Sequence, residues 1–408
     1  MGSDKLHPQA RVAFMLAGLY NSAEALCQIF VNVYLWRNSQ DLNVLCKYYL
    51  ALYAVTPVVF LLAGWYSKVR DRLHVYRLGI LFHAVYYATL LILRERSAEF
   101  TVPLGILLGV TWGMFWAGAN TINYDVTTQG RREYFIGLMN AISHVARMFA
   151  PLLSGFIIYY HPGLEGYHLI FAIVLGIYCA AFLVSHLLTP DQERTPFKIR
   201  RALFPGRDQW DWRYILLASF TLAGTFEIPT FLLSILMYVV SSNELNVGTY
   251  ASAQALIAII VSFYFGRLIM PESRRTYLLI SSALLAASGI VFFFPITLTS
   301  LIVFGILRSA SMALFGIGHF SVRMEVIMRC VEHPMQRIEY LSAWEIPLAF
   351  GRLTMMVALV VLNELYPEDF LGIRIVIIVL CVLRIATYVF LAKTSVLQKL
   401  PVAKQAAR

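Results

Sequence analysis

The dominant pattern along the chain is a series of apolar stretches of about 20 residues, separated by short polar segments. A hydrocarbon core about 30 Å thick requires helices of this length, because lipid offers no partner to an unpaired backbone amide. The pattern therefore predicts an all-α membrane protein with twelve transmembrane helices. The expected helices are approximately 12–36, 44–67, 76–94, 102–123, 134–160, 167–188, 214–240, 249–270, 276–295, 299–321, 338–363 and 372–392.

The composition argues against a soluble protein. Hydrophobic residues make up 59% of the chain and charged residues only 14%, and the mean hydropathy is +0.68. The net charge of +10 would suit a nucleic-acid partner only if the basic residues formed one surface stripe. They instead lie between the apolar stretches, so no nucleic-acid partner is expected. The five cysteines show no paired or metal-like spacing and are interpreted as free thiols.

The positions of the basic residues predict the orientation in the membrane. Clusters lie at 68–77, 131–132 and 194–213, and all three fall on one side if the N-terminus is cytoplasmic. We therefore expect both termini to be cytoplasmic, in a cell (inner or plasma) membrane. The expected division is an N-terminal six-helix half (1–188), a cytoplasmic linker (189–213), a C-terminal six-helix half (214–392) and a cytoplasmic tail (393–408).

Three short patterns recur between the halves, each in helices six positions apart. Internal repeats of this kind are typical of transporter folds, so the sequence predicts two pseudo-symmetric six-helix bundles. The repeat aligns Asn21 with Glu227 and Asn140 with Glu345. The patterns are Leu-Ala-Gly at 16–18 and 222–224, Gly-Ile-Leu with a later Phe and Gly at 105–118 and 305–318, and two arginines at Arg132 and Arg147 and again at Arg337 and Arg352.

Twelve helices, a basic central loop and a six-plus-six repeat resemble the major facilitator superfamily over essentially the whole chain. The superfamily's motif after helix 2 is a glycine, an acidic residue and a basic run. Here Gly64, Lys68, Asp71 and Arg72 provide a shifted version of it. The resemblance implies a gating or structural role for Asp71 and Arg72.

Helix 5 resembles that of facilitator antiporters, which carry a glycine- and proline-rich motif there. Small residues allow helix backbones to approach closely, and the proline kinks the helix. Close packing and the kink are both retained when glycine is replaced by alanine or serine. The resemblance favours an exporter. The chain departs from the antiporter pattern in helix 4, where antiporters carry an arginine and this chain has Leu108. Arg308 occupies the matching place in helix 10. The motif positions are Gly137, Ala146, Ala150, Pro151, Ser154 and Gly155.

Six ionisable residues are expected near the middle of the membrane, where each costs about 2.5 to 3.5 kcal/mol on insertion scales. Glu24 and Glu227 are the candidates for proton coupling, since a carboxyl group without a close cation suits a proton carrier. With a close arginine the same group would stay ionised and act as a lock, and the sequence leaves both roles open. Arg147, Arg352 and Glu345 are structural or gating candidates, and Arg384 is expected at the periphery. The six residues are Glu24, Arg147, Glu227, Arg308, Arg352 and Arg384.

The resemblance places helices 1, 4, 7 and 10 around a central cavity, and polar and aromatic residues on these helices are the substrate candidates. Helix 1 carries a polar stripe at helical spacing, and helix 4 carries two tryptophans followed by two asparagines on one face. An aromatic wall with few polar anchors suits an amphipathic organic solute, although it is equally consistent with membrane packing. The substrate-cavity candidates are Asn21, Gln28, Trp112, Trp116, Asn120, Asn123 and Arg308, and the stripe also includes Glu24 and Asn32.

These features predict a secondary active transporter that works by alternating access, with proton-coupled export of an amphipathic or lipid-like solute as the leading mode. A symporter or uniporter for an organic anion is the alternative, favoured if the arginines are essential. A membrane-embedded enzyme or sensor is disfavoured. His83, His144 and His319 lie singly on three helices, and no phosphate-binding glycine-rich loop is present, so no metal or cofactor is expected. The expected partners are a small-molecule substrate, protons and membrane lipids, and the protein is expected to function as a monomer.

Overall fold

The computed structural model describes residues 8–125, 132–161, 163–189, 196–333, 336–366 and 370–398. In this part of the chain, twelve helical segments are long and apolar enough to cross a membrane, and no strand occurs. This confirms the predicted all-α architecture and the number of helices. The observed segments begin and end within a few residues of the predicted ones in most cases, and the largest difference is at helix 10, which runs to Cys330.

Contacts between α-carbons divide the chain into two compact units. Unit 1 comprises Met1–Phe197 together with Ser242–Ser252, and unit 2 comprises Lys198–Ser241 together with Ala253–Arg408. The first turns of one helix, Glu244–Gly266, thus belong to unit 1 while the rest of that helix belongs to unit 2.

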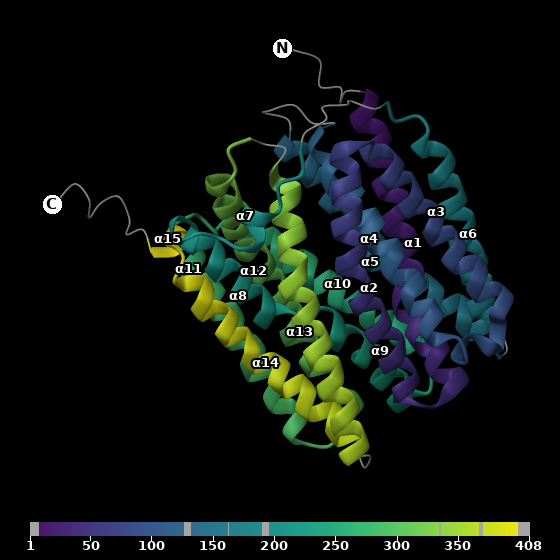
Figure 1. The fold of residues 1–408 in the computed structure, drawn as a ribbon. Coiled ribbons are helices and arrows are strands. Elements are labelled where there is room, and N and C mark those ends of the chain that lie inside the picture. The colour runs from purple at the N-terminus through teal and green to yellow at the C-terminus, as the bar shows by residue number, and fades with distance from the viewer. Residues whose placement is uncertain are drawn as a thin grey trace. The chain divides into compact units, whose positions relative to one another are not determined.

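Unit 1 contains the first six long helices. α2 and α3 pack against α4, α1 packs against α5 and α6, and α3 packs against α6. Figure 1 shows α1, α3 and α6 side by side within this unit. The elements are α1 (Pro8–Ser39), α2 (Leu42–Val69), α3 (Arg72–Leu93), η1 (Arg94–Ala98), α4 (Thr101–Asp125), α5 (Arg132–Tyr160) and α6 (Glu165–Ser185).

Unit 2 contains the elements from α7 onward, apart from the first turns of α10. α11 packs against α12 and α14, and α8 packs against α13 and α14. In Figure 1, α13 and α14 run beside each other at the green-to-yellow end of the chain. The elements are α7 (Arg200–Leu203), η2 (Arg207–Gln209), α8 (Trp210–Leu222), α9 (Glu227–Ser241), α10 (Glu244–Gly266), α11 (Arg274–Ser288), η3 (Gly289–Phe293), α12 (Leu298–Cys330), α13 (Arg337–Leu365), α14 (Leu371–Ala392) and α15 (Ser395–Gln398).

The seventh membrane segment is broken, and the break lies earlier than the proline suggests. The sequence predicts one helix with a kink at Pro229, whereas α8 ends at Leu222 and α9 begins at Glu227. Gly224 lies in the break with φ of +79°, a conformation that glycine adopts without steric cost. Pro229 instead lies in the first turn of α9, where its missing N–H leaves no hydrogen bond unmade.

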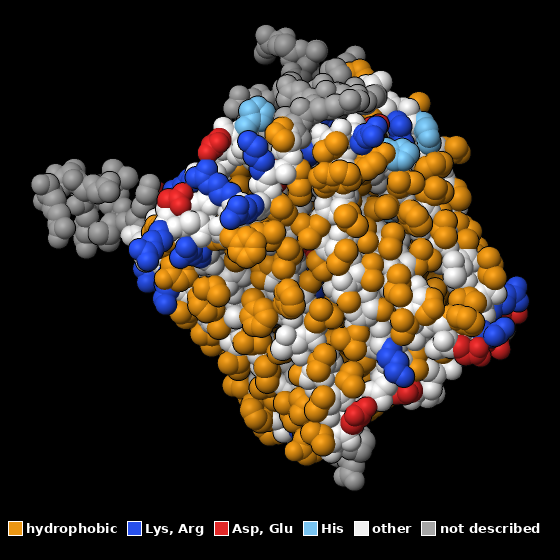
Figure 2. All heavy atoms as spheres, in the orientation of Figure 1, with side chains coloured by type: hydrophobic (Ala, Val, Ile, Leu, Met, Phe, Trp, Pro, Cys, Tyr) orange, Lys and Arg blue, Asp and Glu red, His pale blue; other side chains and the backbone are white. Residues whose placement is uncertain are grey.

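Large apolar side chains cover the sides of the helices. Leu62, Phe263 and Phe293 are each more than half exposed. On the face shown in Figure 2, hydrophobic side chains cover a broad band, and charged side chains gather beyond its edges. Such a surface is stable against lipid rather than water.

Candidate functional site

Glu24 on α1 is the centre of the polar site in unit 1. Its Oε1 accepts a 2.8 Å hydrogen bond from the Tyr178 hydroxyl on α6. The same oxygen lies 3.7 Å from Nε2 of His83 on α3. His83 and Tyr178 are fully buried, and the Glu24 side chain is 16% exposed. Three helices therefore bring one carboxyl group, one imidazole and one phenol together.

The hydrogen bonds of His83 fix which of its nitrogens faces Glu24 as an acceptor. Nδ1 lies 2.8 Å from the Gly79 carbonyl oxygen, so Nδ1 carries a proton and donates it to that oxygen. In the neutral ring Nε2 is then an acceptor, and it has no hydrogen-bond partner among the described residues. Two acceptors, Nε2 and a carboxylate oxygen, would repel each other at this distance. One proton placed on either group removes the conflict.

Aromatic rings enclose this acid–imidazole pair. Tyr178 stacks on His83 with ring centroids 4.6 Å apart, and Phe115 and Tyr20 each contact His83 edge-on at 5.4 Å. In the described part of the chain, no lysine or arginine nitrogen lies within 4.0 Å of the Glu24 carboxyl group. A charge on the pair is therefore only slightly solvated and is not directly neutralised.

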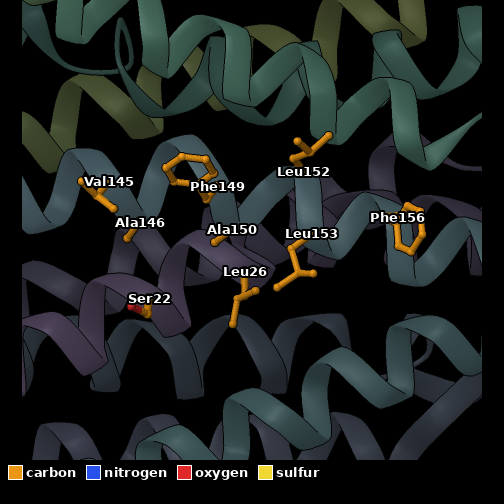
Figure 3. Close-up of a pocket in the computed structure, with 9 residues that line it drawn as sticks. All are labelled: Ser22, Leu26, Val145, Ala146, Phe149, Ala150, Leu152, Leu153 and Phe156. Atoms are coloured by element: carbon orange, nitrogen blue, oxygen red, sulfur yellow. The ribbon is translucent and has the colours of Figure 1, made fainter.

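Asn21 lies one turn before Glu24 and joins α1 to α5. Its Oδ1 accepts a 2.8 Å hydrogen bond from the Ser143 hydroxyl, and its Nδ2 donates to the Ala17 carbonyl oxygen at 2.8 Å. Adjacent to this pair is a cavity of about 690 Å³ between α1 and α5. Figure 3 shows that Ser22 and Leu26 contribute from α1 and that all other lining residues come from α5. The lining residues are Ser22, Leu26, Val145, Ala146, Phe149, Ala150, Leu152, Leu153 and Phe156.

The small residues of α5 allow a close backbone contact with the first turns of α10. A methyl group on Gly248 would lie 2.3 Å from the Pro151 carbonyl oxygen and 3.2 Å from the Gly155 α-carbon. Ser154 beside them is fully buried. This contact has the character of the close helix packing that the motif predicts, and Ala150 lines the cavity on the same helix.

In unit 2, Arg352 on α13 binds two carboxylates at once. Its Nη2 donates to Glu227 Oε1 at 2.8 Å, and its Nη1 donates to Glu345 Oε1 at 2.6 Å. The side chains of Arg352 and Glu345 are only 10% and 11% exposed, and that of Glu227 is 27% exposed. A carboxyl group without a close cation suits a proton carrier, whereas Glu227 lies directly against Arg352. Its geometry is therefore that of an ion-pair partner and not of a free proton carrier.

Two further arginines lie at the break between α8 and α9. Arg308 on α12 donates through Nη2 to the Phe226 carbonyl oxygen and to Thr230 Oγ1, both at 2.8 Å. Arg384 on α14 lies over the Phe226 ring at 4.9 Å from the guanidinium carbon. Arg384 is fully buried, so its expected peripheral position is wrong. It points into the bundle because Phe315 on α12 offers a ring face 4.0 Å from its guanidinium carbon.

Comparison with known proteins identifies the family of this fold. Residues 38–336 match the family model described as Major Facilitator Superfamily. The chain belongs to the Major Facilitator Superfamily. It is 28% identical over 354 residues to a protein named "Uncharacterized protein YqgE" from Bacillus subtilis (strain 168), which covers 87% of this chain and 82% of that protein.

Solved transporter structures share the superfamily fold. A bacterial homologue of the iron transporter ferroportin, in an inward-facing state, matches with a TM-score of 0.70 at 17% identity, over 96% of this chain and 100% of that one. A mutant of the nucleoside transporter NupG matches with a TM-score of 0.70 at 13% identity, over 94% and 99%. As a superfamily member with twelve candidate spans among its described residues, the protein is a multi-pass membrane protein and a secondary transporter of a small molecule, not an enzyme.

The other sequence-predicted residues occupy varied positions in this superfamily fold. Trp116 is 43% exposed, and Asn120 and Gln28 are also exposed. Trp112 is half-buried, and the side chain of Asn123 and the burial of Gly137 lie outside what the structure describes. Asp71 caps α3, since its carboxylate accepts hydrogen bonds from the backbone of the helix's first turn, and Arg72 is buried. Arg147 is an exposed residue of α5.

The structure brings two groups into these sites that the sequence does not single out. His83 has no ligand spacing, which argues against a metal site but hides its role as an ionisable residue inside the membrane. Arg323 lies beyond residue 321, the expected end of helix 10, and its guanidinium carbon lies over the Trp344 ring at 3.9 Å. Treating every histidine in an apolar stretch as a charge candidate would have found His83. Among the described residues, no three His, Cys, Asp or Glu side chains gather as a metal site would require.

Proposed function

We propose that the protein couples proton movement to export of an amphipathic small organic solute, and that Glu24 and His83 share the coupling proton. The observation that carries this proposal is the position of His83 Nε2, a buried acceptor without a hydrogen-bond donor, 3.7 Å from the Glu24 carboxyl oxygen. A proton bound between them makes the site neutral, and its loss leaves a negative charge within an aromatic shell.

Groups on α1, α3 and α6 surround Glu24. Tyr178 on α6 donates a hydrogen bond, His83 and Tyr87 lie on α3, and Tyr20 belongs to α1. Arg147 on α5 acts on the Glu24 carboxyl group electrostatically, without an ion pair between them. Loss of the proton would therefore strengthen the attraction between α1 and α5, which links the protonation state to the packing of these helices.

The cavity between α1 and α5 supports an amphipathic solute. Eight of its nine lining residues are apolar, and Ser22 lies next to the hydrogen-bonded Asn21 and Ser143. An apolar body would fill the cavity while a polar group meets this pair. The close contact of Gly248 with α5 supports the export direction, because it matches the packing role of the antiporter-like motif.

Glu227 takes a different role in this proposal. Because Arg352 neutralises it directly, Glu227 holds α9 to α13, and Glu24 becomes the leading coupling residue.

We further propose that both termini are cytoplasmic, that the protein lies in a plasma membrane in contact with lipids, and that it functions as a monomer. The domain boundaries at 188, 213 and 392 belong to the same proposal.

The test uses purified protein reconstituted into lipid vesicles, with the compound that gives the largest stabilisation in a thermal-shift screen of lipids, drugs and organic anions. Glu24→Gln should abolish uphill transport driven by a pH gradient and retain exchange of the compound at equal concentrations. Glu227→Gln, the contrasting variant, should retain pH-driven transport. Uphill transport by Glu24→Gln at the wild-type level would refute the proposal.

A further inference from the structure

Arg384 is a buried cation whose nitrogens lack acceptors. Among the described residues, its Nη2 has one hydrogen-bond contact, with the Met312 thioether sulfur at 3.0 Å, which is a weak acceptor. Its Nε and Nη1 have no hydrogen-bond partner among the described residues. No carboxylate within the described part of unit 2 lies within 4.0 Å of it. A lone cation in a membrane interior is costly, so such a residue points to a function.

The carboxylates of unit 2 do not compensate this charge. Glu227 and Glu345 are already bound to Arg352. Arg323 on α12 lies over the Trp344 ring instead. Among these described residues, the four arginines Arg308, Arg323, Arg352 and Arg384 outnumber the two carboxylates Glu227 and Glu345.

Arg308 and Arg384 meet at the same residue. Arg308 donates to the Phe226 carbonyl oxygen, and Arg384 lies over the Phe226 ring. Arg308 also donates to Thr230 Oγ1 and Gln254 Oε1, which are neutral oxygens like that of Phe226. Phe226 belongs to the break between α8 and α9, and broken membrane helices are where transporters of this type place their binding sites.

Aromatic rings lie beside the Arg384 guanidinium group. Phe315 lies against the Arg384 guanidinium, and His319, one turn further along α12, stacks on Phe315 with ring centroids 5.5 Å apart. Two guanidinium groups provide donors for two or more oxygens of one anionic group, and the rings provide an apolar wall for the body attached to it.

We propose that Arg384 and Arg308 bind the acidic group, a carboxylate, phosphate or sulfonate, of the transported solute. The solute is then an amphipathic organic anion. This inference rests on the proposed transport function and names its substrate class. The anion supplies the oxygens that the Arg384 nitrogens lack, and alternating access exposes this buried point to the solute.

The experiment measures thermal stabilisation of purified protein by three probes. Naphthalene-2-sulfonate is the charged probe, naphthalene-2-methanol has the same ring system without charge, and sodium chloride supplies an inorganic anion. The sulfonate should raise the Tm of the wild type, and the alcohol and chloride should not. Equal stabilisation by the alcohol, full stabilisation by chloride, or no stabilisation by the sulfonate would each overturn the proposal.

Arg384→Met separates binding from a structural role. It removes an uncompensated charge, so the Tm without probe should rise, while the apparent Kd for the sulfonate should weaken at least tenfold. A purely structural arginine would give a lower Tm and an unchanged Kd. Arg374→Met on the same helix is the matched control, since within the described residues Arg374 donates only to the backbone oxygens of Phe292 and Phe293. It should leave the Kd unchanged.

The anion site at Arg384 and proton coupling through Glu24 can be refuted independently of each other. Loss of sulfonate binding in Arg384→Met is measured without a pH gradient, and proton coupling through Glu24 is measured with one. A sulfonate that binds in Glu24→Gln but not in Arg384→Met supports the anion site whatever the outcome for coupling.

Discussion

Removal of Arg352 should destabilise unit 2 strongly, because it leaves two buried carboxylates without their cation. At an effective dielectric constant of about 20, one charge pair about 4 Å apart is worth roughly 4 kcal/mol, and desolvation offsets much of this. The measured cost of removing one partner from a buried pair is about 3 to 5 kcal/mol. Arg352→Met should therefore lower the free energy of unfolding by this amount.

The assay is thermal unfolding of purified protein in detergent, followed by tryptophan fluorescence. At roughly 2 to 4 °C per kcal/mol for a unit of this size, the Tm of Arg352→Met should fall by roughly 6 to 20 °C. Adding Glu345→Gln to Arg352→Met should restore more of the Tm than adding Glu227→Gln, because the Glu345 side chain is 11% exposed and that of Glu227 is 27%. A Tm within 2 °C of the wild type for Arg352→Met, or equal rescue by both changes, would refute this reasoning.

Three further predictions follow from the packing and the basic-residue pattern. Gly248→Ala should lower the Tm and the transport rate, since its methyl group would meet the α5 backbone, and the control Gly176→Ala should change neither because no atom lies within 4 Å of the added carbon. Ala150→Leu should fill the cavity and abolish transport without reducing expression, and normal transport would remove the case for the cavity. In a variant without native cysteines, Glu165→Cys should react with an impermeant reagent outside the cell and Gln192→Cys should not, and reversed labelling would contradict the proposed orientation.

Most of the fold could be predicted from the sequence because the membrane restricts the possibilities. Each spanning segment must be a helix of about 20 apolar residues, so hydropathy alone determines the number of helices. The sequence predicts one kinked seventh helix with the kink at Pro229, whereas the helix is broken between Leu222 and Glu227. Gly224 adopts the unusual backbone conformation, while Pro229 starts the next helix.

The candidate sites were predictable only as single residues. The high cost of charge in a membrane identified Glu24, Glu227 and Arg352 from their positions alone. Their partners depend on tertiary packing, since Glu227 and Arg352 are 125 positions apart in the chain. A pairing over this distance has no local signal, so the lock at Glu227 could not be distinguished from a proton carrier. The buried place of Arg384 depends in the same way on contacts with α12.

Glu24 and His83 hold one exchangeable proton in the proposed mechanism, and infrared difference spectroscopy of the purified protein can detect it. Titration from acidic to alkaline pH should remove the absorption of a protonated carboxyl group from the wild-type spectrum. The same band should be absent from Glu24→Gln, and in His83→Phe it should persist at a shifted frequency, because the imidazole acceptor is gone. Identical difference spectra for the wild type and Glu24→Gln would contradict the account.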